Sequence, residues 1–498
     1  MNISNLNIDK RFIKWLHKQF FEKKMMTPLG IFLLIAIAVG GGALAAIDLF
    51  FVPLLIGGLL IGIIVAYICV FRPLTGFYIA SAFSIFIFYP NHLLGRQIVS
   101  LSPVLEVLFF LIFIGTYINS SEKTQVNSPL IKTLISISLI LNTALIILQV
   151  FNPNVDTIAI WGSVFRRWLV FMMIYVVAYR LIDNREKLIY FIKFWIIAVF
   201  VIALYGCFQQ WFGFLPMEMN FIMSVPGQFD LMNQGGNIRK FSFLSDVVSF
   251  GVICGSTAVL TLLIAIYTKK PRVKYTLIFF SMIMLLGMAY SGTRTTTVIL
   301  PIGFIMYGFL TIQSKKTLIT LFLGSIMALV VFFAPIYSNA TLNRMRTTFD
   351  SKDESLNLRE RNRHYIQPYL VSHPVGGGIG TTGELGAAEF PDHPLAKFPT
   401  DSGFLRIGLE MGWIGLIAWV FFNLAILWQS VIYYFRMKDP ELKLIMVAFI
   451  SCIFPILVIQ YSQESIGQFP GSVFFFSVLS LMKRLLEFDE GKLSVNLN

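Results

Sequence analysis

The residues of this chain best suited to chemistry are arginines in a long polar segment, residues 335–402. Arginine presents a rigid fork of N–H donors that binds phosphate or carboxylate oxygens in pairs, whereas lysine is a strongly hydrated point charge. On a helix, Arg359 and Arg363 would share one face, because they lie four positions apart, and could bind one anion between them. Arg361 would point away from this face, toward an acid or a lipid headgroup. The spacing therefore predicts an anion-binding site.

Arginines at the ends of other apolar segments are candidates for the same site. They are Arg166, Arg167, Arg239, Arg294 and Arg406. Each could instead pair with a lipid phosphate or with a nearby acid. The acids in question are Asp156, Asp350, Glu354, Glu360 and Asp401. Glu106 and Asp246 lie within apolar segments, where an unpaired charge is costly, so we expect them to line a groove or to pair across helices.

An acidic residue, Asp401, stands just before an apolar segment that begins near Gly403. Two roles are open for it. The carboxylate could act as a general base, or it could cap the N-terminus of the next helix. The two roles are compatible, so the residue type alone does not choose between them.

No metal or cofactor site is expected. His364, His373 and His393 lack metal-ligand spacing, and no Asp-x-Asp pair is placed to hold a divalent ion. The four cysteines lie inside apolar stretches without CxxC spacing and are expected to be packing residues.

The composition indicates the elements that must position these side chains. The chain has 498 residues, of which 56% are hydrophobic and 13% charged, too little polar surface for a soluble protein of this size. Apolar stretches of about 17 to 25 residues, each long enough to cross a membrane as a helix, recur along the chain. We predict an all-α fold, a polytopic transmembrane helical bundle of about fourteen spans, with a range of about 12–14. One large extracytoplasmic loop should contain short helices.

The distribution of charge predicts orientation and partners. The net charge of +13 is spread over loops, which fits anionic membrane lipids better than nucleic acid. Placing the lysine-rich loops in the cytoplasm puts both termini there and the arginine-rich segment outside. The predicted domains are a cytoplasmic amphipathic segment at 1–28, transmembrane helices 1–11 at 29–336, an extracytoplasmic catalytic or binding loop at 337–402, transmembrane helices 12–14 at 403–484 and a cytoplasmic tail at 485–498.

Three short motifs follow one another in the C-terminal half. The first is Ser291-Gly292-Thr293-Arg294, between two apolar segments. The second runs from Ser355 and Arg359 to the turn His373-Pro374-Val375-Gly376-Gly377-Gly378-Ile379-Gly380. The third is Asp401-Ser402-Gly403-Phe404-Leu405-Arg406, with Glu410, Gly412 and Gly415. In this order, over residues 284–432, they resemble the O-antigen ligase and Wzy-type polysaccharide polymerase superfamily, whose members are multi-span glycosyltransferases acting on lipid-linked sugars outside the cytoplasm.

The resemblance, together with the arginine pattern, implies roles for individual residues. The candidate catalytic residues are Asp401, Arg359 and Arg294. The candidate substrate-binding residues are Arg363, Arg361, Arg166, Arg167, Arg239, Arg406, Glu410 and His393. Ligases of this family typically show a histidine and a small polar residue where this chain has Asp401-Ser402, and His393 lies eight residues earlier, before a proline. This departure favours a polymerase.

The expected function is polymerisation of polyprenyl-diphosphate-linked repeat units into O-antigen, capsular or exopolysaccharide, at the outer face of a bacterial cytoplasmic (inner) membrane. The expected partners are the lipid-linked oligosaccharide, membrane lipids, a chain-length regulator and export machinery. The alternatives are an O-antigen ligase that uses a lipid or other acceptor, a flippase or other transporter, and a non-catalytic sensor or scaffold. The chain shows no internally repeated halves, which argues against a transporter.

Overall fold

The computed structural model describes residues 51–96, 100–118, 130–155, 158–224, 227–234, 236–333, 354–400 and 402–491. These residues are almost entirely helical, and nine of their helices are long and apolar enough to cross a membrane. The all-α, polytopic prediction is confirmed at this level. The count of about fourteen spans stays a prediction. The segment at 1–28, Asp401 and residues 492–498 of the predicted tail lie outside the described residues.

The chain divides into two compact units. The described part of the first consists of residues 51–80 and 107–118. It contains α3 (Phe51–Phe71) and parts of α4 (Pro73–Phe86) and α6 (Ser102–Ile118). Gly115 of α6 lies directly against α3, since an added Cβ would stand 2.4 Å from the carbonyl oxygen of Val70. Close backbone approach at a small residue is a common way for helices to associate in a membrane.

Every described candidate site residue lies in the second unit. Its long helices are α7 (Leu134–Leu148), α8 (Ile158–Leu181), α9 (Arg185–Phe212), α12 (Val247–Tyr267), α13 (Pro271–Tyr290), α15 (Ile299–Thr311), α16 (Lys315–Phe333), α20 (Gly403–Arg436), α21 (Pro440–Ile459) and α22 (Gly471–Asp489). Its other elements are α5 (Tyr89–Leu94), the 3-10 helix η4 (Gln149–Phe151), α10 (Pro216–Ser224), α11 (Gln228–Met232), α14 (Arg294–Thr297), α18 (Glu354–Ser372), α19 (Gly383–Glu389) and the antiparallel pair β1 (Asn233–Gln234) and β2 (Asn237–Ile238).

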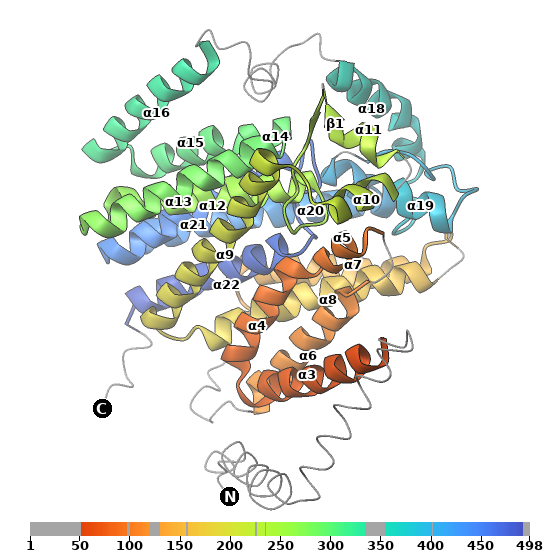
Figure 1. Ribbon diagram of the computed structural model, residues 1–498, viewed down its shortest axis with the longest axis horizontal. Coiled ribbons are helices and arrows are strands. Elements are labelled where there is room, and N and C mark those ends of the chain that lie inside the picture. Colours follow the sequence, from red (N-terminus) through yellow and green to blue (C-terminus); the bar gives the residue numbers. More distant parts are fainter. Residues whose placement is uncertain are drawn as a thin grey trace, which may run out of the picture. The chain divides into compact units, whose positions relative to one another are not determined.

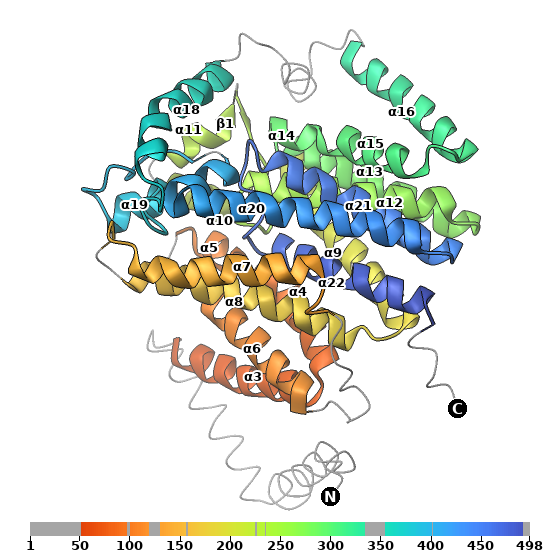
Figure 2. The same cartoon turned by 180° about the vertical axis from the view of Figure 1, so that it is seen from behind.

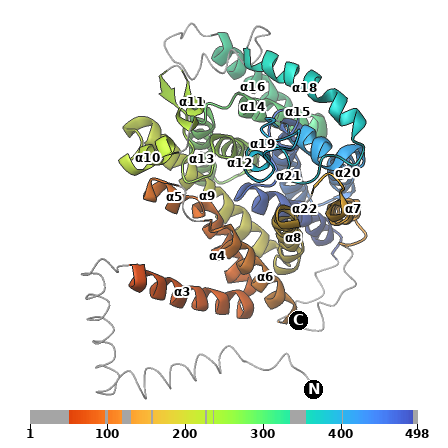
Figure 3. The ribbon, with the colours of Figure 1, turned by 90° about the vertical axis from the view of Figure 1, so that its right-hand side faces the viewer.

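Helices α12 and α21 form the centre of this unit. Most of their side chains are buried, as expected of a helix that is apolar all round. Figure 1 and Figure 2 show α12, α13, α20 and α21 running along similar directions. In Figure 3, α7 lies beside α20 and α8 beside α22.

The two ends of the second unit differ. At one end, here called the short-turn end, helices are joined by the brief segments 182–184, 268–270, 312–314 and 437–439. Arg185 pairs there with Asp439, and the Asp489 carboxylate accepts the backbone N–H groups of Lys438 at 2.9 Å and Asp439 at 2.5 Å. The other end, here called the loop end, carries α10, α11, α14, α18, α19 and segment 460–470. The lysine-rich turns gather at the short-turn end; its cytoplasmic orientation stays a prediction.

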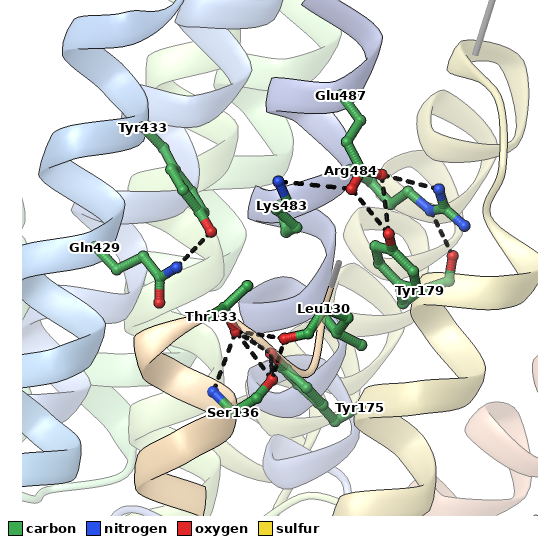
Figure 4. Close-up of polar contacts among 10 residues, drawn as sticks. All are labelled: Leu130, Thr133, Ser136, Tyr175, Tyr179, Gln429, Tyr433, Lys483, Arg484 and Glu487. Carbon is green, nitrogen blue, oxygen red and sulfur yellow. Dashed lines mark hydrogen bonds and ion pairs between the residues drawn. The ribbon is translucent and has the colours of Figure 1, made fainter. Parts of the chain in front are cut away.

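A buried ionic network joins α8 and α22 near the short-turn end (Figure 4). Glu487 is 3% exposed and accepts hydrogen bonds from the Tyr179 hydroxyl at 2.8 and 3.0 Å and from Arg484 Nη1 at 2.9 Å. Arg484 Nε donates to the carbonyl oxygen of Tyr179 at 2.7 Å, and its guanidinium stacks 3.7 Å from the centre of the Tyr179 ring. Each buried charge therefore has a partner, as an ionisable residue in a membrane requires.

The first turn of α7 is held by polar side chains in the same region (Figure 4). Thr133 caps the helix, and its hydroxyl oxygen accepts the Ser136 N–H at 3.2 Å. The Tyr175 hydroxyl of α8 lies 2.9 Å from Ser136 Oγ. Gln429 Oε1 of α20 accepts the Ile135 N–H at 2.8 Å. The N–H groups that a helix start leaves free are thus satisfied within the bundle.

Replacing Glu487 by alanine is expected to lower thermal stability strongly, because Arg484 would remain as a buried cation without its acid. Removing one partner of a buried pair costs about 3–5 kcal/mol. The double variant Glu487→Ala/Arg484→Leu should regain part of this loss, since the leftover charge is gone. Thermal unfolding in detergent measures both, and a single variant that melts with the wild type would contradict the expectation.

Candidate functional site

Helix α20 is interrupted within the third sequence motif. Gly412 has φ 68° and ψ −165°, outside the helical region. This backbone conformation is open to glycine and strained for other residues. The interruption leaves the backbone groups around it in need of partners outside the helix.

The glycine-rich turn, residues 374–380, supplies those partners. The Gly377 N–H donates to the Leu409 carbonyl oxygen at 2.8 Å. The Gly378 N–H donates to the Glu410 carbonyl oxygen at 2.9 Å. Because backbone groups released by a helix break need other partners, and the turn provides them, the second and third motifs form one structural unit.

The fit between turn and break explains two of the glycines. The Trp413 N–H donates to the Pro374 carbonyl oxygen at 3.0 Å, so the two segments touch backbone to backbone. A Cβ on Gly412 would stand 1.9 Å from that same Pro374 oxygen. A Cβ on Gly376 would stand 2.5 Å from the Glu410 carbonyl oxygen. Any side chain at either position would force the segments apart.

The link after α7 holds the turn from its other side. Gln149 Nε2 donates to the Val375 carbonyl oxygen at 3.0 Å, and Asn154 Nδ2 donates to the Gly376 carbonyl oxygen at 2.8 Å. Asn152 Nδ2 reaches both oxygens, at 3.2 and 3.3 Å. The turn is therefore clamped between two parts of the chain that lie far apart in sequence.

The start of α20 is anchored to the end of α21. Ser402 is the N-cap, its hydroxyl oxygen accepting the Leu405 N–H at 3.3 Å. The Gly403 N–H and the Ser402 hydroxyl donate to the Gln460 carbonyl oxygen at 2.9 and 3.1 Å. Ser402 thus takes the capping role that the sequence left open for Asp401, which itself lies outside the described residues.

An arginine between two glutamates lies at the first turns of α20. Arg406 Nε donates to Glu410 Oε1 at 3.1 Å, and Arg406 Nη1 donates to Glu464 Oε2 at 2.6 Å. The Thr382 hydroxyl donates to Glu410 at 2.5 Å, and the Thr400 hydroxyl donates to Glu464 at 3.2 Å. Glu410 is 4% exposed, so its contacts with Arg406 and Thr382 compensate its burial.

A cavity of about 170 Å³ lies beside this arginine. Its charged lining residues are Arg167, Arg406, Glu410 and Glu464. Its large apolar lining residues are Ile146, Val164, Trp168, Phe171, Ile379, Ile407, Met411, Trp419 and Ile466. No carboxylate of the described residues forms an ion pair with Arg167, whereas Arg406 has two such partners. Arg167 is therefore a cation available to an anionic ligand.

The two acidic residues that the sequence placed in apolar segments, Glu106 and Asp246, have protein partners in the structure. Arg166 forms an ion pair with Glu106, so Glu106 pairs across helices, one of its two expected roles. Asp246 caps α12, its carboxylate accepting the N–H groups of Val248 and Ser249, each at 2.8 Å. Substrate contact by Arg166 stays a prediction.

Arg239 holds the turn of the first motif. Its Nε donates to the Ser291 carbonyl oxygen at 3.0 Å and its Nη2 to the Thr293 hydroxyl at 2.6 Å. Gly292 has φ 61°, and a Cβ there would lie 3.0 Å from Arg239 Cγ. Arg294, half-buried, begins α14 directly after this turn. Arg239 thus positions the segment that carries Arg294.

Helix α18 confirms the helical placement of Arg359 and Arg363, but Arg363 has a protein partner. Its Nη1 and Nη2 donate to the hydroxyl and carbonyl oxygens of Tyr461 at 2.7 and 2.9 Å, and its guanidinium lies 4.2 Å from the centre of the tyrosine ring. This contact ties α18 to segment 460–470. Arg361 is exposed, and the Arg359 side chain is outside the described part of the structure.

His393 stabilises a turn in the loop end. Its Nδ1 accepts the Leu395 N–H at 3.1 Å, and its ring lies beside Gly377. Burial, together with neighbouring His373, lowers the pKa of His393. The histidine is therefore placed to support the glycine-rich turn in its neutral form.

The structure brings Arg167, Arg406 and Glu410 together, and it adds residues that sequence reasoning missed. Glu464 and Thr382 contact the charged group directly. The sequence offered one indication of Glu464, which is its position as an acidic residue between two apolar segments. Within the described ranges no cluster of three His, Cys, Asp or Glu side chains forms a metal site, so metal independence stays a prediction.

One comparison with known proteins bears on this site. Residues 279–420 match the family model described as O-Antigen ligase. The match supports the superfamily that the three motifs resemble, and it covers the glycine-rich turn and the first half of α20 with Arg406 and Glu410. Arg167 and Glu464 lie outside the matched residues. No curated protein matches the chain.

Proposed function

We propose that this protein, which carries an O-antigen ligase domain, polymerises polyprenyl-diphosphate-linked repeat units at the outer face of a bacterial inner membrane. Arg167 carries the proposal. No carboxylate of the described residues forms an ion pair with this arginine, and it lies on the wall of a cavity shared with Arg406. A cation in this setting favours an anionic ligand. The diphosphate of the donor supplies that anion.

The leaving group determines what the protein must do. The oxygen of the acceptor hydroxyl bonds to the anomeric carbon of the donor, the bond from that carbon to the diphosphate breaks, and the diphosphate leaves with the electron pair. Since negative charge grows on the diphosphate, fixed arginine donors stabilise the transition state more than the ground state. Arg167 is the first candidate for this role, with Arg294, Arg359 and Arg361 as further proposed contacts.

The apolar wall of the cavity fits the membrane-embedded part of such a donor. Trp168 Nε1 donates to the Thr143 hydroxyl and Trp419 Nε1 to Gln460 Oε1, each at 2.8 Å. Both indole N–H groups are thus satisfied by the protein, so the rings offer apolar surface to a ligand. We assign this wall, with Phe171, to the first isoprene units or to a sugar face.

Polymerase rather than ligase is favoured by Asp401-Ser402, at the position where ligases of the family typically show a histidine. A ligase that uses another acceptor is the alternative within the family. We further propose cytoplasmic termini and an association with a chain-length regulator and export machinery.

The decisive experiment incubates the purified protein, in lipid nanodiscs, with one defined lipid-linked repeat unit. A polymerase is expected to yield a ladder of products that differ by one repeat. A single transfer to an added foreign acceptor, without a ladder, would identify a ligase. Donor recovered chemically unchanged in both reactions would reject glycosyl transfer and favour a transporter.

A further inference from the structure

Glu464 lies on the wall shared by two cavities. It belongs to segment 460–470, between α21 and α22, and lines both the cavity of about 170 Å³ and a second one of about 30 Å³. Polar residues of the smaller lining include Ser249, Ser256 and Gln468. The rest of its lining is largely apolar, and a space of this size beside polar side chains can hold a water molecule. Glu464 therefore faces the proposed reaction site and also lines a small cavity that contains polar side chains.

The Glu464 carboxylate is held in place and still has acceptor capacity. Arg406 Nη1 donates to one oxygen at 2.6 Å and the Thr400 hydroxyl to the other at 3.2 Å. A carboxylate offers about four acceptor positions, so two donors leave room for a hydroxyl. The Glu464 side chain is 26% exposed, against 5% for Glu410. Of the two glutamates at the cavity, Glu464 is the one that a substrate can reach.

Charged groups surround this carboxylate from three helices. Arg406 and Glu410 come from α20, and Arg167 comes from α8. On α12, Asp246 connects to the smaller cavity through the Ser249 hydroxyl, which lies 2.7 Å from Asp246 Oδ2 and 2.6 Å from Gln468 Oε1. Ser249 and Gln468 thus line the smaller cavity together with Glu464.

We propose that Glu464 is the general base of the transfer, a role that rests on the proposed function. As the acceptor oxygen bonds to the anomeric carbon, its proton passes to the Glu464 carboxylate, while the diphosphate departs with the electrons of the broken bond. Glu464 returns the proton to solvent before the next transfer. Arg406 positions the carboxylate through the contact of its Nη1 with Glu464 Oε2.

Replacing Glu464 by glutamine should lower kcat by about a hundredfold or more, because glutamine keeps the size of the side chain and cannot accept the proton. The acid limb of the pH–rate profile, which reports protonation of the base, should disappear with it. Donor affinity, measured by binding of a fluorescent polyprenyl diphosphate, should stay within about threefold. Glu464→Asp should retain part of the rate and the acid limb.

Two parallel variants make the result specific. Glu389→Gln makes the same chemical change at an exposed glutamate of the loop end and should behave as wild type. Asp401→Asn tests the base expected from the sequence. If it removes the acid limb while Glu464→Gln keeps it, or if Glu464→Gln only raises KM for the donor, Glu464 is not the base. A wild type that makes no glycan product would overturn the proposed function together with this role.

Discussion

Replacing Gly412 by alanine is expected to abolish glycan transfer. The position has φ 68° and ψ −165°, and a Cβ there would stand 1.9 Å from the backbone oxygen of Pro374. The backbone strain alone costs about 1–3 kcal/mol, and no rotamer change relieves a contact between Cβ and a carbonyl oxygen. The glycine-rich turn must therefore leave the break, which removes the support of Glu410 and displaces Arg406 from the cavity.

The rate of ladder formation, normalised to the amount of inserted protein, measures this effect. Gly471→Ala is the matched control, since nothing lies within 4 Å of an added Cβ at that helix start, and it should keep the wild-type rate. A Gly412→Ala protein that extends glycans at the wild-type rate would show that the docking of the turn into α20 is not needed for transfer.

Replacing Arg167 by alanine should reduce kcat by about 10²–10³, the usual loss for one donor aimed at developing negative charge. Binding of the diphosphate donor should weaken as well, because no carboxylate of the described residues forms an ion pair that already occupies the Arg167 guanidinium. Arg167→Lys should recover little if both oxygens of one phosphate are held by the planar guanidinium.

The control for this change removes an arginine of the opposite end. Arg185 pairs with Asp439 at the short-turn end, and Arg185→Ala should leave both the donor affinity and the rate unchanged. Radiolabelled donor and single-turnover kinetics separate the two quantities. Equal single-turnover rates for Arg167→Ala and wild type would exclude Arg167 from the diphosphate site. Arg294 and Arg359 would then be the remaining candidates for binding the diphosphate.

Local sequence predicted the helical membrane fold well, because span length and hydropathy depend on composition within one segment. The residue type also indicated that many arginines bind anions. It could not show whether the anion is a carboxylate of the protein or a phosphate of the substrate. Arg363 binds Tyr461, and Arg166 binds Glu106. Of the two arginines that line the described cavity, Arg406 forms ion pairs with carboxylates and Arg167 forms none. Donor geometry is the same for a protein carboxylate and a substrate phosphate, so spacing alone cannot distinguish them.

The sequence by itself showed the motifs that contain Gly376 and Gly412. The structure shows that both residues have a positive φ, which glycine adopts without strain. Only the tertiary structure decided that these glycines meet, with the turn donating to the carbonyl groups that the break of α20 exposes. It also decided that Glu464, from a segment without a recognised motif, joins Arg406 and Arg167 at one cavity. Such contacts depend on how α8, α20 and segment 460–470 pack, and that packing is the sum of many long-range contacts that no single stretch of sequence contains.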